Sequence, residues 1–399
     1  MSILANIPLA PRDPILGLTE AFVADTRPGK VNLGVGVYLG PDGKIPLLDC
    51  VRTAEAALAA SPGPRGYLPI DGLPAYTRAV RELVFGADSE PVTSGRVVTV
   101  QGLGGTGALR IGAEFLRRTD AAPTVLISDP SWENHQALFT RAGFEVRSYR
   151  YYDAARGGVD VDGMVADLRA AAPGTVVVLH ACCHNPTGYD LAEDEWARVA
   201  EVVVEAGLVP FLDLAYQGFA QGIEADGAVV RRFAALGVPM LVASSFSKSF
   251  SLYGERVGGL SVVAADAEEA ARVLSQLKVT IRTTYSNPPT HGAAVVSTVL
   301  GDPALRAGWE QELEGMRLRI REMRGALVEA LAAAGAARDF GFIADQVGMF
   351  SYCGLSVSQM QQLREVHGVY GTDAGRICVA ALNPGNVDTV ARAIAAVIG

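Results

Sequence analysis

Lysine is scarce in this chain of 399 residues, because its basic side chains are overwhelmingly arginine. Only Lys30, Lys44, Lys248 and Lys278 remain. Lys30 and Lys44 lie in polar, turn-like stretches, whereas Lys248 follows the apolar run 238–246, where a buried ammonium is costly. Two explanations fit Lys248. It either loses its proton and forms an imine, which arginine cannot do, or it packs its stem while the amine reaches water.

Several other features are also missing, and each absence narrows the function. The formal charge is -9 and no basic run is interleaved with aromatic residues, so we expect no nucleic-acid partner. No stretch approaches the roughly 18 apolar residues of a membrane span, and the first residues lack a basic stretch followed by an apolar one. The five cysteines are an odd count, which favours reduced thiols. We therefore expect a cytoplasmic protein without a membrane partner.

Short apolar runs recur along the chain, with helical patterns between them. Because these runs are rich in Val and Leu without alternation, they predict strands that are buried on both faces of a sheet. The predicted strands cover residues 96–101, 123–129, 174–181, 208–215, 240–246 and 258–265. The alternation of strands and helices predicts an α/β fold with a doubly wound, mostly parallel sheet. A long amphipathic helix over 302–335, followed by shorter elements, predicts a smaller α+β domain.

Polar and aromatic residues follow these strands at their carboxyl ends, where open parallel sheets bind ligands. Separate strands lead to a glycine-rich segment and to Trp132, Asn185, Asp213 with Tyr216, and Lys248. Asp213 lies in an apolar run, where burial of a carboxylate is costly unless a cation meets it, so we interpret it as functional. Taken singly, Trp132 and Tyr216 are also consistent with core aromatics, and Asn185 with a turn.

Two local patterns allow other interpretations. Residues 102–107 fit G-x-G-x-x-G between a strand and a helix, with Asp129 at the next strand end, as in dinucleotide sites. Physically, the pattern provides a helix N-terminus with free N–H groups, and such a helix end binds any phosphate ester. The segment 180–184 contains two histidines and two cysteines, as in a metal cluster. Because adjacent residues of an extended strand point to opposite faces, we expect no metal there.

Five separated motifs give a more specific indication. An aldehyde cofactor with a phosphate tail and a pyridine ring needs an imine lysine, a phosphate cradle, a carboxylate, a ring stack and donors to its phenolate oxygen. The motifs GGTGALR, SWENH, CCHNPTG, DLAYQGF and SSFSKSFSLYGERVGG offer these groups, and they resemble the class I, fold-type I pyridoxal-phosphate aminotransferases. The resemblance extends from the segment 13–18 to Gly375 and Arg376, which is essentially the whole chain.

The resemblance implies a catalytic centre of Lys248, Asp213 and Tyr216. Lys248 would form the internal aldimine with pyridoxal 5'-phosphate and move the proton of the substrate's α-carbon. Asp213, with His135 behind it, would pair with the pyridinium nitrogen, while Asn185 and Tyr216 would donate hydrogen bonds to the phenolate oxygen. The implied cofactor contacts are Tyr67 of a second subunit, Gly105, Thr106, Trp132, Asn185, Asp213, Tyr216, Ser245, Ser247, Lys248 and Arg256.

The resemblance also implies how an amino acid or 2-oxo acid is bound. Arg376 would bind the α-carboxylate, and Arg282 of a partner subunit would pair with the distal carboxylate of a dicarboxylic substrate. On its own, Arg282 is also consistent with a solvated helix face. Because Tyr67 and Arg282 would complete the neighbour's site, the resemblance implies a homodimer. The implied substrate contacts are Gly36, Trp132, Asn185, Arg282 and Arg376.

The domain organisation follows from the same resemblance. It implies an N-terminal arm over residues 1–13, a small domain built from 14–45 and 316–399, and a large cofactor-binding domain over 46–315.

Pocket-side residues give mixed indications of the substrate. Several segments, and the apolar residues Leu39 and Ile45, are most similar to the bacterial aromatic-amino-acid (tyrosine) aminotransferases. Val37, Thr106 and Asn287 instead resemble the aspartate enzymes. Ala374 replaces a serine that is usual before Gly-Arg in both groups.

We therefore predict ping-pong transfer of the amino group of tyrosine, phenylalanine or aspartate to 2-oxoglutarate. The alternatives are a strict aspartate aminotransferase, a non-catalytic binding protein built on this fold, and a NAD-dependent oxidoreductase.

Overall fold

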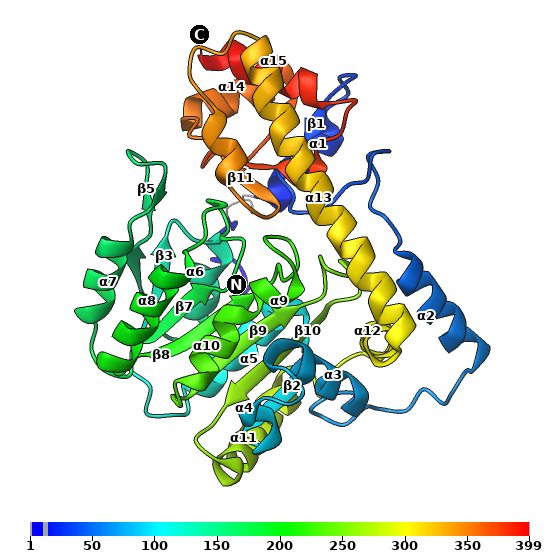
Figure 1. Cartoon of the computed structure of the whole chain (residues 1–399), viewed down its shortest axis with the longest axis vertical. Coiled ribbons are helices and arrows are strands. Elements are labelled where there is room, and N and C mark those ends of the chain that lie inside the picture. Colours follow the sequence, from blue (N-terminus) through cyan, green and yellow to red (C-terminus); the bar gives the residue numbers. More distant parts are fainter. Residues whose placement is uncertain (1, 11–14, 399) are drawn as a thin grey trace.

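A seven-stranded sheet forms the centre of the larger part of the molecule in this computed structural model, which describes residues 2–10 and 15–398 (Figure 1). The strand order is β2-β10-β9-β8-β7-β3-β4. All strands run parallel except β10, which is antiparallel to both of its neighbours. The strands are β2 (Val97–Leu103), β3 (Thr124–Asp129), β4 (Glu145–Arg150), β7 (Val176–His180), β8 (Val209–Leu214), β9 (Met240–Ser245) and β10 (Val257–Val263).

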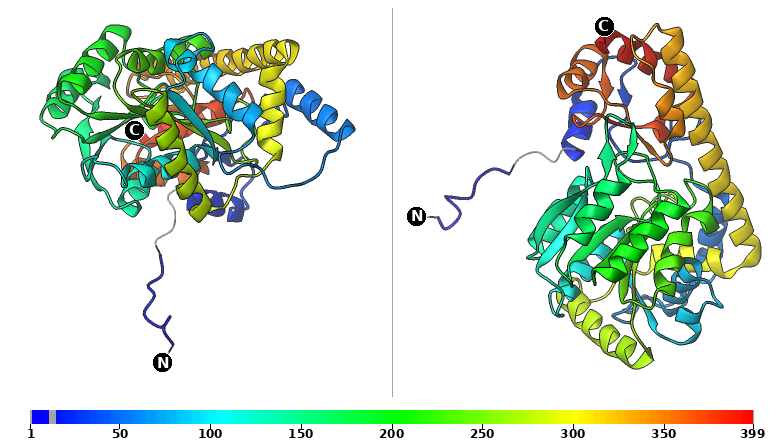
Figure 2. Two further views of the ribbon diagram at one scale, coloured as in Figure 1. Left: turned by 90° about the horizontal axis from the view of Figure 1, so that it is seen from below. Right: turned by 60° about the vertical axis from the view of Figure 1, so that its left-hand side comes forward.

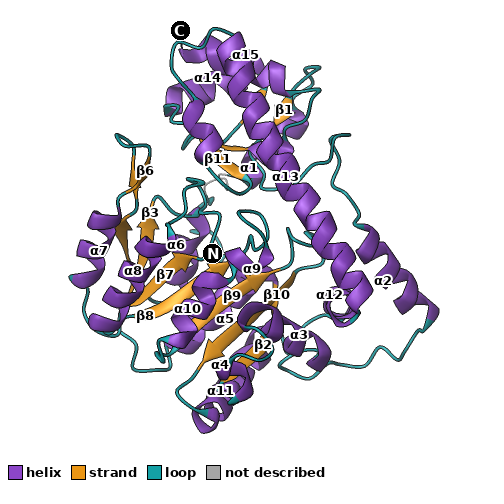
Figure 3. Ribbon diagram, viewed as in Figure 1, coloured by secondary structure: helices purple, strands orange, loops and turns teal. Residues whose placement is uncertain are grey.

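Helices cover both faces of this sheet, as Figure 3 shows. Successive residues of one strand belong to different cores: Val177 packs with the helices of one face and Val178 with those of the other. The first face carries α3 (Pro74–Phe85), α7 (Val161–Arg169), α8 (Glu193–Glu205) and α10 (Ala228–Ala235), and the second carries α5 (Gly104–Leu116), α6 (Glu133–Arg141) and α11 (Ala267–Thr284). Burial on both faces explains the uninterrupted apolar runs of the strands.

A second, smaller part packs above the carboxyl ends of the strands (Figures 1 and 2). The 31-residue helix α13 (Pro303–Ala333) runs along both parts and packs against α2, α12 and α15. The smaller part, which we call the cap, contains α1 (Leu16–Ala24), β1 (Val31–Asn32), β11 (Phe350–Tyr352), α14 (Val357–His367), β12 (Val369–Tyr370), β13 (Arg376–Cys378) and α15 (Val387–Ile398). Its strands form two-stranded pairs, β1 with β12 and β11 with β13.

The remaining elements are short or lie at the edges. They are α2 (Asp49–Ala60), α4 (Glu90–Thr93), β5 (Tyr152–Asp153), β6 (Gly158–Val159), α9 (Ile223–Asp226), α12 (His291–Gly301) and the 3₁₀ helices over Gly341–Asp345 and Val379–Ala381. Residues 2–10 are exposed and extend away from the body, while residues 11–13 of the expected arm lie outside the described residues (Figure 2). None of the described helices combines the length and apolar character needed to cross a membrane.

The predicted fold class is confirmed, since the sheet is mostly parallel and doubly wound. Each of the six predicted strands overlaps an observed one, and the long helix of 302–335 is α13. The strand β4 was not predicted. It lies at the edge of the sheet, and its sequence EVRSYR carries charged, exposed residues in place of an apolar run.

Candidate active site

The carboxyl ends of β2, β7, β8 and β9 surround a cavity of about 390 Å³. Because β10 is antiparallel, its first residues also lie at this edge and bring Arg256 to the same cavity. Residues 35–37 of the cap contribute another wall. The predicted site residues that line the cavity are Gly36, Gly105, Thr106, Trp132, Asn185, Asp213, Tyr216, Ser245, Ser247, Lys248 and Arg256.

Lys248 follows the end of β9 and is partly buried, with its amine beside the cavity. The Nζ atom lies 4.7 Å from the centre of the Tyr216 ring. Burial lowers the pKa of the Lys248 amine to about 8, although the negative charge of Asp213 opposes this shift. A measurable fraction of this amine is therefore unprotonated near neutral pH, which a nucleophile or proton acceptor requires.

Asp213 lies near the end of β8 and is buried. Its Oδ2 atom lies 3.0 Å from Nε2 of His135, and Nδ1 of His135 lies 3.0 Å from the hydroxyl of Ser131. Burial by itself raises the pKa of the Asp213 carboxyl, but the His135 contact and nearby positive charge outweigh it and hold the pKa below its usual value. The carboxylate is thus ionised and fixed in orientation.

The other end of the cavity collects donors for an anion. Gly105 and Thr106 lie in the first turn of α5, where backbone N–H groups are free and the helix dipole favours negative charge. Ser245 and Ser247 supply hydroxyl groups, and Nη1 of Arg256 donates to Ser247 Oγ at 3.3 Å. A Cβ atom on Gly105 would lie 3.2 Å from Cβ of Ser245, so a side chain there would crowd this group of donors.

A buried arginine stands at the cap side of the site. Arg376 is 2% exposed, and it donates from Nη1 to Asn185 Oδ1 at 3.1 Å and from Nη2 to the Gly34 carbonyl at 2.7 Å. Its Nε atom is buried without a hydrogen-bond partner among the described residues. The guanidinium also stacks over Phe350, with the ring centre 4.3 Å away. A planar cation with a free donor is suited to a carboxylate.

Three predicted residues do not line the cavity. Arg376 lies behind the lining residue Asn185, whereas Tyr67 and Arg282 are not brought near the cavity by this chain. Tyr67 is 95% exposed, and Arg282, also exposed, donates to the hydroxyl of Ser286 on its own helix end. The expectation that a partner subunit supplies both side chains stays a prediction.

Six further residues line the cavity. Val37 was expected on the pocket side, whereas Val35, Leu109, His180, Ala215 and Tyr253 were not predicted. Tyr253 is part of the motif around Lys248, and its hydroxyl accepts the N–H of Tyr38 at 2.8 Å. The Nε2 atom of His180 is buried without a hydrogen-bond partner in the described part of the chain, and burial lowers the pKa of this imidazole to about 3. One feature of the sequence could have indicated His180 as a cavity residue, because it lies near the carboxyl end of the predicted strand 174–181.

The histidines and cysteines of 180–184 separate into different surroundings. His180 groups with His135 and Asp213, whereas Cys182 and Cys183 lie near Asp226. The argument from strand alternation is wrong for the two cysteines, because β7 ends at His180 and Cys183 has a φ of 53°. Burial raises the pKa of the Cys183 thiol to about 12, so this thiol stays protonated.

The donor set fits pyridoxal phosphate. An amine of lowered pKa and an ionised carboxylate line one part of the cavity, and anion donors line another. Lys248 would hold the aldehyde carbon, Asp213 the ring nitrogen, and the α5 amides with Ser245 and Arg256 the phosphate.

Comparison with known proteins agrees with this geometry. A family described as aminotransferase class I and II matches residues 28–394. An aspartate aminotransferase of Pseudomonas aeruginosa is 60% identical over 398 residues, which covers 100% of both chains, and an aromatic-amino-acid aminotransferase of Escherichia coli is 52% identical over 97% of this chain and 98% of its own. A crystal structure of an aromatic-amino-acid aminotransferase from Burkholderia pseudomallei, covalently bound to pyridoxal phosphate, has a TM-score of 0.97 and 63% identity over 100% of both chains. The chain therefore belongs to the class I and II aminotransferases and is a transaminase that works with pyridoxal phosphate.

Proposed function

We propose that the enzyme moves the amino group of an aromatic amino acid or of aspartate to 2-oxoglutarate in two half-reactions. This proposal rests on the arrangement of one cavity. Lys248 and Asp213 line the cavity at the strand ends, and Arg376 lies beside it and donates a hydrogen bond to the lining residue Asn185. Bound pyridoxal phosphate supplies an aldehyde that bonds covalently to amines and a ring that takes up electrons.

Lys248 and Asp213 perform the central roles in this proposal. Lys248 would anchor the aldehyde of the cofactor, and its amine would accept and return the proton of the substrate's α-carbon. The lowered pKa of the amine, about 8, favours this exchange near neutral pH. Asp213 keeps a proton on the ring nitrogen, because His135 holds its carboxylate ionised and in place. Tyr216 joins them as the third catalytic residue, donating to the phenolate oxygen.

The remaining predicted contacts hold the cofactor and the substrate. We propose that Trp132 stacks on the ring and that Asn185 donates its amide N–H₂ to the phenolate oxygen, since its Oδ1 already accepts from Arg376. Gly105, Thr106, Ser245, Ser247 and Arg256 hold the phosphate. Arg376 pairs with the α-carboxylate, whose negative charge satisfies the free Nε donor.

We further propose a homodimer in which Tyr67 and Arg282 complete the partner's site. Both side chains are exposed in one chain, and among the residues that the structure describes the cavity is lined by no arginine other than Arg256, which is assigned to the phosphate. The proposed domains are an arm over 1–13, a small domain from 14–45 and 316–399, and a large domain over 46–315. The proposed location is the cytoplasm.

The breadth of substrate is supported by the walls of the cavity and by the names of the relatives. Val35, Val37 and Leu109 give it an apolar surface, which favours a phenyl ring. Leu39 and Ile45 line a neighbouring cavity of about 730 Å³, which shares Val35 and Val37 with the first. A strict aspartate aminotransferase is the second candidate, because the relative from Pseudomonas aeruginosa carries that name.

The test is a comparison of kcat/KM for tyrosine, phenylalanine and aspartate with 2-oxoglutarate as acceptor. We expect turnover of all three. A large preference for aspartate with negligible aromatic turnover would overturn the proposal in favour of the second candidate.

A further inference from the structure

Helix α13 carries a buried cation that has no carboxylate partner among the described residues. Arg324 is 2% exposed, and its guanidinium donates only to backbone carbonyl oxygens. Nη1 donates to Ile343 at 3.3 Å, and Nη2 donates to Val347 at 3.2 Å, to Gly348 at 2.8 Å and to Phe350. All four acceptors belong to the segment 343–350, which we call the cap loop. One side chain therefore bonds to four residues along the loop.

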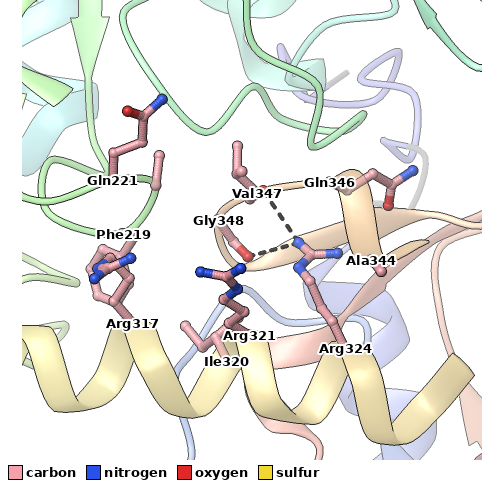
Figure 4. Close-up of a pocket in the computed structure, with 11 residues that line it drawn as sticks. Phe219, Gln221, Arg317, Ile320, Arg321, Arg324, Ala344, Gln346, Val347 and Gly348 are labelled. Carbon is pink, nitrogen blue, oxygen red and sulfur yellow. Dashed lines mark hydrogen bonds between the residues drawn. The ribbon is translucent and has the colours of Figure 1, made fainter. Parts of the chain in front are cut away.

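Figure 4 shows this arrangement from the side of an adjoining cavity of about 320 Å³. Arg324 rises from α13 and reaches the carbonyls of Val347 and Gly348, while Arg317 and Arg321 line the cavity beside it. Only a planar fork with several N–H groups can satisfy acceptors that lie in different directions, and a lysine offers a single point of charge.

The cap loop also binds the turn that carries Asn185. The N–H of Val347 donates to the Gly188 carbonyl at 2.7 Å. A Cβ atom on Gly188 would lie 2.9 Å from the Phe350 carbonyl oxygen, and Gly188 has a φ of 73°, so this contact requires glycine. The loop is thus held between Arg324 on one side and the 185–188 turn on the other.

The last residue of the cap loop projects its ring into the substrate side of the site. The Phe350 ring lies 4.3 Å from the Arg376 guanidinium and meets the Tyr216 ring edge to face at 5.9 Å. A Cβ atom on Gly36 would lie only 2.6 Å from this ring. Phe350 therefore contacts three residues of the proposed site. Its carbonyl accepts from Arg324, and its strand β11 pairs with β13, which carries Arg376.

We propose that Arg324 is a positioning residue for substrate carboxylate binding, which acts through Phe350 on Arg376. The proposal rests on the proposed function, in which Arg376 pairs with the α-carboxylate. Loss of the guanidinium would remove a donor from four carbonyls and let the cap loop move, and a shift of Phe350 removes the surface against which the Arg376 plane is stacked. A group that must match a carboxylate bidentately is sensitive to such a shift.

The experiment compares Arg324→Ala with Leu331→Ala in the holoenzyme. Leu331 is a buried residue of the same helix, so its truncation lowers stability without removing a bond to the cap loop. For Arg324→Ala we expect the KM values of the amino acid and of the oxo acid to rise about 10-fold to 100-fold, while kcat changes less. We expect the Kd of succinate, a dicarboxylate that cannot react because it has no amino or oxo group, to rise by about the same factor when it is measured by calorimetry. Cofactor affinity stays at the wild-type value, because Arg324 touches none of its proposed contacts.

Chemical rescue gives the decisive readout. Alanine at 324 opens a guanidinium-sized space toward the adjoining cavity, so guanidinium chloride at concentrations well below those that unfold the protein restores succinate affinity, whereas sodium chloride does not. If Arg324→Ala does not fold, Arg324→Lys is measured in the same way, and we expect a smaller loss.

Three results overturn the proposal: wild-type succinate affinity in the Arg324 variants, an equal loss in Leu331→Ala, or a loss that sodium chloride reverses as well as guanidinium does. A wild-type enzyme that does not transaminate these substrates overturns the proposed function instead.

Discussion

The inner and outer regions of the site differ in how much one chain supplies. At the strand ends, Lys248, Asp213 and His135 are fixed by packing and hydrogen bonds within a single chain. At the outer edge, Tyr67 and Arg282 are exposed and do not line the cavity. The difference teaches that one chain prearranges the proposed chemistry at the strand ends, whereas the proposed recognition of the distal part of a substrate would require a second copy.

Removal of the Lys248 amine is expected to have the largest effect. In Lys248→Ala the group that anchors the cofactor and moves the proton is lost, so kcat falls about 10⁴-fold or more. The measurement is steady-state transamination of aspartate. The matched control is Lys44→Ala, which removes an exposed lysine and leaves kcat unchanged. Comparable activity in the two variants would contradict the role of Lys248.

Asp213→Asn tests the electrostatic part of the inner region. The amide cannot hold the ring nitrogen protonated, so we expect kcat to fall about 10²-fold to 10³-fold while the protein stays folded. Thermal unfolding and kcat are measured together. An Asp213→Asn variant that keeps wild-type kcat would remove the carboxylate from the mechanism. His135→Gln, which keeps a donor near Asp213, is expected to lose less.

The inner region was the part of the site that sequence could predict. Apolar runs buried on both faces identify the strands, and each proposed catalytic group lies at or just beyond the end of such a run. The polar edge strand β4 lacked this signal. The position of His180 in the cavity was not predicted, because the segment 180–184 was considered only as a metal cluster, and that interpretation was rejected.

The cap loop and the outer edge could not be predicted for a different reason. Arg324 lies in an ordinary amphipathic helix, and only the fold brings the carbonyls of 343–350 to its guanidinium. The contacts proposed for Tyr67 and Arg282 would depend on a second chain, and a pattern within one chain does not contain that geometry.

The pH dependence of the stability of the cofactor-free protein tests how strongly the inner region buries the Lys248 amine. The pKa of Lys248 is lowered from 10.5 to about 8 by burial. Below pH 8 the amine is charged in both states, so its burial destabilises the fold. Between about pH 8 and 10.5 the folded state releases this proton while the unfolded state keeps it. The free energy of unfolding, relative to Lys248→Met, therefore rises with pH by about 1 to 3 kcal/mol.

Urea unfolding of both proteins at several pH values from 7 to about 10.5 measures this difference. A difference between wild type and Lys248→Met that does not change with pH would mean that the amine is as well solvated in the fold as in the unfolded chain.

Arg282→Ala addresses the outer region. Loss of one charged donor to the distal carboxylate is expected to lower kcat/KM for aspartate about 10-fold to 100-fold, and to affect phenylalanine much less, since it has no such carboxylate. The comparison of both substrates is the measurement. Arg272→Ala, on the same helix and paired with Glu268, serves as the control and leaves both values unchanged. An equal loss for both substrates would contradict a role in side-chain recognition.

Mixing Lys248→Ala and Arg282→Ala subunits shows whether Arg282 serves the partner's site or the site of its own chain. In a hybrid of Lys248→Ala and Arg282→Ala chains, one site combines an intact Lys248 with the intact Arg282 of the other chain, and the second site has both defects. After unfolding and refolding of an equal mixture, random pairing of a two-fold symmetric dimer therefore restores about a quarter of the wild-type sites for aspartate. If Arg282 instead served the site of its own chain, mixing would restore no activity above the sum of the two variants.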